Sequence, residues 1–357
     1  LNKKLPFKLR VKIKYLNWIK MSAIINISPL SFPWQTKDPF LFCAFHEDNY
    51  PAGNSTSGVD PTLLTGRNLG QDFQIKDGFR MYHGTTVPGF PAHPHRGFET
   101  VTIVQKGLVD HSDSLGAAGR FGNGDVQWMT AGKGVQHCEM FPLLDTSKNN
   151  ALLMFQIWIN LPKVKKMCSP HFAMLWSEKI PRYTHQDDEN KKTEVTVIAG
   201  HLFQVKGLPP APNSWANDPK NEVCIWTLTM EPKAQWTLPA HGANLSRLLY
   251  YFRGKDIELE DKKVLPNHTI EICSDQTIHI TNGAEVSHFL FLQGKPINEP
   301  VAQYGPFVMN YQHEIQETMQ EYQSTQFGGW PWPKPDHIHA KESGRFAKYV
   351  DGKIETR

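Results

Sequence analysis

The chain is poor in cysteine, has no long hydrophobic run, and is almost balanced in charge. Its 357 residues include five cysteines, and none of them belongs to a CxxC pair. This scarcity argues against a disulfide framework and favours a reducing compartment, the cytoplasm, with the nucleus as an option in a eukaryote. No stretch approaches the roughly 20 apolar residues that a membrane helix needs, so no membrane association is expected.

The balance of charge also argues against a nucleic-acid partner. A net charge of +3 arises from 38 basic and 35 acidic residues, whereas nucleic-acid-binding domains usually carry a larger basic excess or a basic stripe. The first twenty positions hold seven Lys or Arg and no acidic residue. Residues 1–21 are interpreted as a basic extension, either a targeting arm or, as we favour, a segment upstream of a start at Met21.

Glycine and proline are plentiful, with 26 of each, and they separate many short apolar runs. Short strands at close spacing with glycine turns are typical of all-β barrels or sandwiches. Two such groups of strands occur, divided by a polar, proline-flanked stretch. We therefore predict an all-β chain with a short C-terminal helix, and we divide it into an N-terminal barrel at 22–165, a linker at 166–192, a C-terminal barrel at 193–310, and a helix with an extended tail at 311–357.

The one long helix is expected near the end of the chain. Ile315, Met319 and Tyr322 recur at helical spacing, Asn310 is a candidate N-cap, and Gly328 a candidate stop. The proline-rich tail that follows, WPWPKPDHIHAKESGRF, is predicted to be extended.

Two short motifs carry the chemistry. His93 and His95 are two residues apart, and so are His137 and Glu139 on a separate predicted strand. Because residues i and i+2 of a strand face the same side, two such pairs can surround one point, while Cys138 faces the opposite side and is excluded as a ligand. Three imidazoles and one carboxylate suit iron, copper, nickel or zinc, and such a set leaves positions open for catalysis. A structural zinc site would more often use thiolates.

The chain closely resembles the pirin family of the cupin superfamily. The resemblance extends from about residue 38 to about residue 329 and rests on long motifs in the right order, HPHRGFETVTIV, GDVQWMTAGKGVQHCEM and PINEPVAQYGPFVMN. It implies a bicupin, in which two antiparallel jelly-roll barrels pack face to face and the first holds one metal ion. The family's ligands fall on His93, His95, His137 and Glu139, and the second barrel carries no matching set.

Two residues beside the first motif differ in their expected roles. General cupins take a carboxylate from the position of Glu99, whereas pirins take it from the His-x-Glu strand, so Glu99 is expected to support the ligands or to form the pocket wall. Arg96 is expected on the other face of the strand, in an ion pair. The tail pair His337 and His339 is interpreted as surface.

The resemblance also implies an activity similar to that of quercetin 2,3-dioxygenase. Fe2+ is the expected metal, with zinc, copper, nickel or manganese as alternatives, and the partners would be a small aromatic substrate and O2. Glu139 would be the catalytic base, and Phe98 and Met129 are candidate pocket residues, while Trp128 is assigned to the core. The alternative is a redox-sensitive regulator that binds a protein partner. A monomer is expected in either case.

Overall fold

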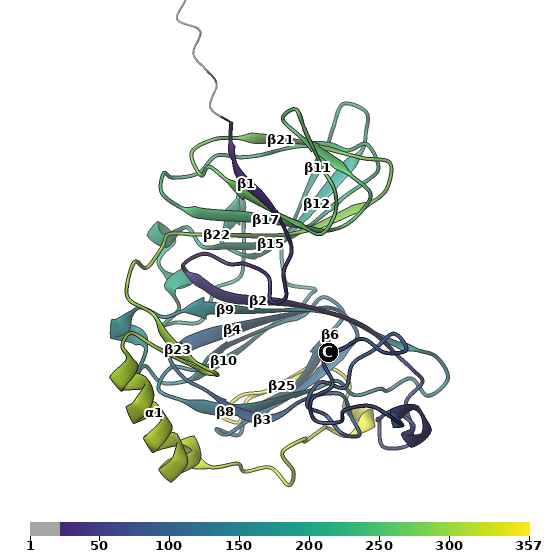
Figure 1. Ribbon diagram of the computed structural model, residues 1–357, viewed down its shortest axis with the longest axis vertical. Coiled ribbons are helices and arrows are strands. Elements are labelled where there is room, and N and C mark those ends of the chain that lie inside the picture. Colours follow the sequence, from purple (N-terminus) through teal and green to yellow (C-terminus); the bar gives the residue numbers. More distant parts are fainter. Residues whose placement is uncertain (1–21) are drawn as a thin grey trace, which may run out of the picture.

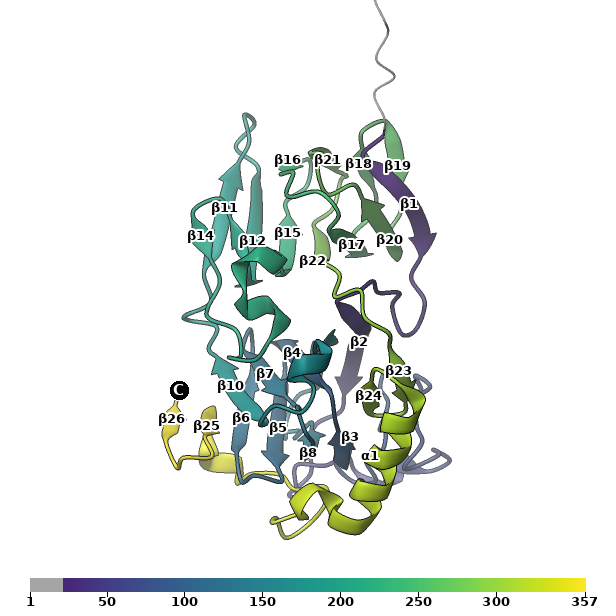
Figure 2. The same cartoon turned by 90° about the vertical axis from the view of Figure 1, so that its left-hand side faces the viewer.

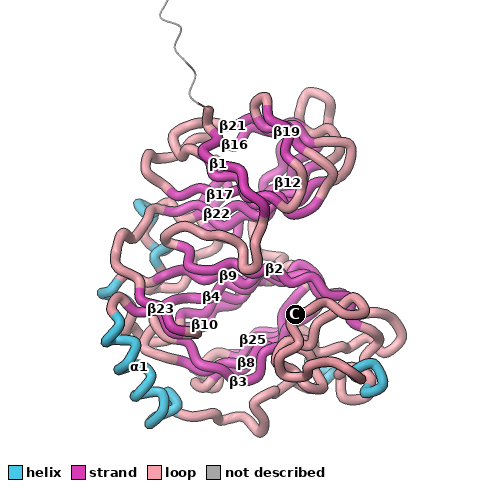
Figure 3. Tube along the Cα trace, in the orientation of Figure 1, coloured by secondary structure: helices cyan, strands magenta, loops and turns pink. Residues whose placement is uncertain are grey.

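The computed structural model describes residues 22–357, which form two β-domains, one above the other in Figure 1, and a single α-helix beside the lower one. Residues 1–21, the predicted basic extension, lie outside the described part. Strands dominate both domains (Figure 3). Within residues 22–357, no helix is long and apolar enough to cross a membrane.

The N-terminal domain consists of two facing sheets. One has the strand order β10-β7-β4-β9-β2, and the other the order β26-β25-β6-β5-β8-β3. All of their pairings are antiparallel. The bounds of these strands are β2 (Phe40–Tyr50), β3 (Gly89–His95), β4 (Phe98–Lys106), β5 (Leu108–Asp113), β6 (Ala118–Gly122), β7 (Val126–Thr130), β8 (Val135–Met140), β9 (Asn150–Asn160), β10 (His171–Leu175), β25 (Phe346–Lys348) and β26 (Ile354–Thr356).

The C-terminal domain repeats this arrangement with the sheet orders β1-β20-β17-β22-β15-β12-β11 and β16-β21-β18-β19. Both domains are therefore jelly rolls of two facing sheets, and the predicted all-β fold is confirmed, although the sheets do not close into barrels. The strands are β1 (Ile24–Pro29), β11 (Arg182–Gln186), β12 (Lys192–Ala199), β15 (Cys224–Met230), β16 (Gln235–Leu238), β17 (Ser246–Arg253), β18 (Ile257–Leu259), β19 (Lys262–Val264), β20 (His268–Ile272), β21 (Ile278–Asn282) and β22 (Ser287–Gly294).

Short elements complete the chain. They are the hairpins β13 (His201–Leu202) with β14 (Val205–Lys206) and β23 (Ala302–Tyr304) with β24 (Phe307–Met309), the helix α1 (Gln312–Thr325), and the 3₁₀ turns Pro61–Leu64, Lys163–Lys165, Trp215–Asn217, Pro219–Asn221, Gln326–Gly328 and Lys341–Ser343.

The two domains share a hydrophobic core where the sheet β10-β7-β4-β9-β2 of the first meets the sheet β1-β20-β17-β22-β15-β12-β11 of the second. On β4, Val101 and Ile103 face this core and contact the C-terminal domain through residues such as Tyr250 and Leu290. The alternate residue Thr102 faces the interior of the N-terminal domain, where its hydroxyl donates to Glu139. The alternation of apolar and polar residues along β4 therefore separates the interdomain core from the polar interior of the first domain.

The first strand of the described chain belongs to the C-terminal domain, and the last two strands belong to the N-terminal domain. Strand β1 pairs with β20 of the C-terminal domain, and β25 from the tail pairs with β6 of the N-terminal domain (Figure 1, Figure 2). The predicted linker 166–192 is not a linker in the structure, because it holds β10, which joins the first domain, and β11, which joins the second. The pairings of β1 and β25 connect segments far apart in the sequence, which periodicity alone does not reveal.

Helix α1 lies along the outside of the N-terminal domain (Figure 2). Ile315 is buried against Phe307 and Met309, with Met319 and Tyr322 at the margin, as the spacing predicted. The predicted cap was wrong by one position. The N-cap is Tyr311, while the side-chain amide of Asn310 donates to Glu299 Oε2 at 3.1 Å and to the carbonyl of Pro300 at 2.9 Å.

Candidate metal centre

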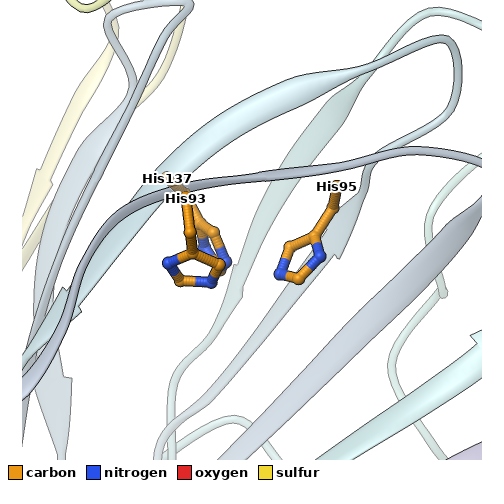
Figure 4. Close-up of side chains that lie close together, drawn as sticks. All are labelled: His93, His95 and His137. Carbon is orange, nitrogen blue, oxygen red and sulfur yellow. The ribbon is translucent and has the colours of Figure 1, made fainter. Parts of the chain in front are cut away.

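Three histidines meet inside the N-terminal domain. His93 and His95 come from β3, and His137 is the direct cross-strand partner of His93 on β8. Their rings lie on the same side of β3 (Figure 4). One ring nitrogen of each lies within 4.8 Å of the others, and no other group of three potential ligands comes together in the described part of the chain. The geometry could therefore hold one metal ion.

Backbone carbonyls orient two of the rings. The Nδ1 atom of His93 lies 2.8 Å from the carbonyl oxygen of Pro91, and Nδ1 of His95 lies 3.4 Å from that of Pro306. A carbonyl only accepts, so each Nδ1 carries the hydrogen and each Nε2 keeps its lone pair. Metal-binding histidines are commonly held by this kind of contact.

The surroundings of the third ring, that of His137, show whether the site suits a metal ion. His137 is fully buried, and neither of its ring nitrogens has a hydrogen-bond partner among the described residues. Burial lowers the pKa of His137 well below its usual value, and it lowers that of His93 to about 4. These imidazoles are therefore neutral at pH 7, the form that binds metals. A buried unpaired nitrogen is costly, and coordination would satisfy it.

Glu139 lies next to this cluster. Its Oε2 is 3.9 Å from Nε2 of His137. The carboxylate accepts hydrogen bonds from the Thr102 hydroxyl at 3.0 Å and from the Gln156 amide at 2.7 Å, and burial raises its pKa. The four-residue ligand set of His93, His95, His137 and Glu139 stays a prediction that this arrangement supports.

A cavity of about 630 Å³ opens onto the cluster. Its walls are largely apolar and aromatic, and most of the lining residues come from β2, β3, β9 and the loop before β3. The lining residues are Phe32, Phe42, Ala44, His46, Phe73, His83, Phe90, Pro91, Ala92, His93, His95, Glu139, Met154, Gln156, Trp158 and Pro306.

The predicted pocket residues Phe98 and Met129 do not line this cavity. The Phe98 ring packs instead against His95 and Trp158, with ring centroids 5.0 and 4.3 Å away. Trp128 belongs to the interdomain core, as predicted. The pocket walls come mostly from segments outside the two histidine motifs.

The expected role of Glu99 was wrong. The chain turns between β3 and β4 at Gly97, whose φ of +87° favours glycine. This turn places Glu99 in the opposite sheet, so that it no longer shares a face with the histidines. Glu99 accepts a hydrogen bond from Thr130 at 2.7 Å, and burial raises its pKa to about 7.

Two predictions of side-chain direction are confirmed. Arg96 points away from the cluster and forms an ion pair with Glu321 of α1 at 2.7 Å. Cys138 packs on the outer face with Val87 and Met140, and its Sγ lies 3.6 Å from the carbonyl oxygen of His337. The tail pair is only partly surface, because Nε2 of His339 contacts the carbonyl of His111 at 2.9 Å.

Two buried histidines near the site were missed. His111 lies 5.5 Å from His137, measured between ring centroids, and His46 lines the cavity. His111 alternates with Asp113 on one strand, a weak signal that could have drawn attention to it. His46 stands alone in its stretch, and its partner Tyr82 is 36 residues away, so the sequence offered no comparable signal.

Two jelly-roll domains with a histidine cluster in the first define a bicupin. The chain matches the Pirin domain over residues 55–159 and the Pirin C-terminal cupin domain over residues 225–328. Pirin-1 of Arabidopsis thaliana is 36% identical over 244 residues, which cover 67% of this chain and 78% of that protein. Pirin of Homo sapiens is 31% identical over 256 residues, which cover 70% of this chain and 81% of the human protein. The chain belongs to the pirin family.

Two further similarities carry an enzyme name. A Pseudomonas aeruginosa protein, named provisionally as a quercetin 2,3-dioxygenase, is 33% identical and covers 67% of this chain and 79% of its own. The crystal structure of quercetin 2,3-dioxygenase from Acinetobacter baumannii superposes with a TM-score of 0.67 at 25% identity, covering 87% of this chain and 99% of that one.

Proposed function

We propose that this protein is a metal-dependent dioxygenase, similar to quercetin 2,3-dioxygenase, that acts on a flavonol or a related enol or phenol with O2. The observation that carries the proposal is a cluster of three neutral imidazoles, two of which, His93 and His95, line a cavity of about 630 Å³ with aromatic walls. Cavities of roughly 300–1,000 Å³ suit small organic ligands, and flat aromatic walls suit a flat aromatic substrate. The two relatives that carry the enzyme name agree with this choice.

We propose His93, His95, His137 and Glu139 as the residues that hold the metal, with Fe2+ as the metal and zinc, copper, nickel and manganese as alternatives. Imidazole and carboxylate together are typical ligands of catalytic iron. A metal here would lower the pKa of a bound substrate hydroxyl and provide redox chemistry with O2.

Glu139 is proposed to take the proton from the substrate hydroxyl. Burial raises the pKa of this carboxyl group, which makes the carboxylate a stronger base. The Thr102 hydroxyl lies 3.0 Å from Glu139 Oε1 and 2.9 Å from Gln156 Oε1. Because a hydroxyl has one hydrogen, it can turn toward Gln156 and free Glu139 Oε1 for the proton. The aromatic walls meanwhile limit the access of water.

Oxygen uptake tests this proposal. Protein loaded with Fe2+ under anaerobic conditions, then mixed with quercetin and O2, is expected to consume oxygen, while metal-free protein and His95→Ala are expected not to. Absence of uptake in the iron-loaded parent with several flavonols and catechols would contradict the enzyme and favour a regulatory protein that binds a partner without turnover.

A further inference from the structure

A buried chain of hydrogen bonds ends at the wall of the cavity. His46 on β2 is only 4% exposed, and its Nδ1 lies 2.8 Å from the hydroxyl of Tyr82. That hydroxyl lies 2.6 Å from Oδ2 of Asp48. The guanidinium of Arg80 binds both oxygens of Asp48 at 3.0 Å. All four side chains are buried, so the chain is shielded from water.

The polarity of this chain is fixed by its charged end. The Asp48 carboxylate, paired with Arg80, can only accept, so the single hydrogen of the Tyr82 hydroxyl goes to Asp48. The Tyr82 oxygen is then left to accept from His46, and Nδ1 of His46 must carry a hydrogen. Burial and the nearby Arg80 lower the pKa of His46 to about 3, so the ring is neutral at pH 7. A neutral ring with hydrogen on Nδ1 has a lone pair on Nε2.

The imidazole that carries this free nitrogen belongs to the cavity wall. His46 lines the same cavity as His93 and Glu139, and its Nε2 has no hydrogen-bond partner within residues 22–357. Two aromatic rings hold the imidazole in place, Tyr82 at 5.0 Å and Phe90 at 6.0 Å between centroids. The Phe90 ring also lies 6.3 Å from that of His93 between centroids, so one aromatic ring lies beside both His46 and the metal centre.

We propose that Nε2 of His46 accepts a hydrogen bond from a second hydroxyl of the substrate, and so selects polyhydroxylated aromatics over those with a single hydroxyl. The inference rests on the proposed function, because it assumes that an aromatic substrate enters this cavity. His46 would bind this hydroxyl without taking its proton, since the imidazolium form is disfavoured by its surroundings. Tyr82 is the positioning residue that keeps the acceptor nitrogen facing the substrate.

Ligand binding measures this selection without turnover. The dissociation constants of quercetin and of flavonols that each lack one of its hydroxyls are measured by fluorescence quenching, with iron-loaded protein under anaerobic conditions. One of these analogues is expected to bind roughly tenfold more weakly than quercetin, about the size of one hydrogen bond. In His46→Phe this difference is expected to vanish, and in the exposed control His279→Phe it is expected to persist. An unchanged preference in His46→Phe would overturn the proposal.

The tautomer provides a test that is independent of any substrate and of the variant's folding. Nitrogen-15 NMR of histidine-labelled, zinc-loaded parent protein is expected to show His46 neutral and protonated at Nδ1 between pH 6 and pH 8. Tyr82→Phe removes the acceptor, and a shift toward the Nε2-protonated form is expected. Protonation at Nε2 in the parent would overturn the inference even if oxygen uptake occurs. The expected tautomer and binding preference without oxygen uptake would leave it standing and contradict only the dioxygenase.

Discussion

Among single residues, Glu139 is proposed for two roles that one substitution can separate. Glu139→Gln keeps the size and a possible oxygen ligand but removes the base. If Glu139 takes the substrate proton, turnover at matched iron occupancy should fall by roughly 10²–10⁴-fold, the usual contribution of general-base catalysis. Oxygen consumption with quercetin measures this, with the exposed Glu47→Gln as the control. Equal rates in the parent and Glu139→Gln would exclude the base role.

The side chain of Lys166 forms hydrogen bonds to three segments of the chain next to the metal centre. Its ammonium group is buried and donates to Gly97 O at 2.8 Å, to Asn160 Oδ1 at 2.6 Å and to Val308 O at 3.1 Å. Lys166→Met would leave these acceptors unpaired, so the free energy of unfolding should fall by about 2–5 kcal/mol in urea denaturation. The exposed neighbour provides the control, since Lys165→Met should change it by less than about 0.5 kcal/mol.

The same lysine predicts a pH dependence. Burial lowers the pKa of Lys166 from 10.5 to about 8. Between these two values the unfolded chain binds the proton that the folded protein has released, so stability should rise with pH in this window. The stability of the parent relative to Lys166→Met should therefore increase from pH 8 to pH 10.5. A constant difference would show that folding does not lower the pKa of Lys166.

At the scale of elements, helix α1 is held to the N-terminal domain through Arg96. The guanidinium pairs with Glu321, donates to the carbonyl of Lys133 at 2.6 Å, and lies 4.5 Å from the centre of the Phe327 ring. Glu321 is half exposed, so its charge should contribute at most about 1 kcal/mol. Arg96 is almost fully buried, so its replacement should lower the local stability of the whole helix.

Hydrogen–deuterium exchange of Gln312–Thr325 distinguishes these contributions. Arg96→Met should clearly accelerate exchange along α1, and Glu321→Gln should change it little. Similar acceleration in both variants would show that the ion pair, rather than the buried contacts of Arg96, holds the helix.

The sequence correctly predicted the direction of side chains that lie on one and the same strand. On β8, alternation placed His137 and Glu139 inside and Cys138 outside, and the structure agrees. The same reasoning failed for Glu99, because the turn at Gly97 transfers the chain to another sheet, and alternation holds only within one strand. His46 could not be found this way, since its setting depends on residues brought together by folding.

At the scale of the whole molecule, each domain includes a strand from the opposite end of the described chain, β1 in the C-terminal domain and β25 in the N-terminal domain. Arg120 donates to the carbonyls of His339, Ala340 and Lys341, and β25 pairs with β6. Truncation after Gly344 would remove β25 and β26 and expose the edge of β6. We expect a lower melting temperature by calorimetry. The metal should be retained, because the ligand-bearing strands β3 and β8 lie at the opposite edge of this sheet. An unchanged melting temperature would show that these strands do not contribute to stability.

The most direct test of the metal centre is elemental analysis of three proteins after anaerobic loading with Fe2+ and desalting. The parent should hold one metal ion per chain. Cys138→Ser should hold the same amount, because its side chain faces away from the histidines. His95→Ala should lose most of the metal, since one of the three clustered imidazoles is gone. Full iron occupancy in His95→Ala, or loss of iron in Cys138→Ser, would contradict the assignment of the metal to this cluster.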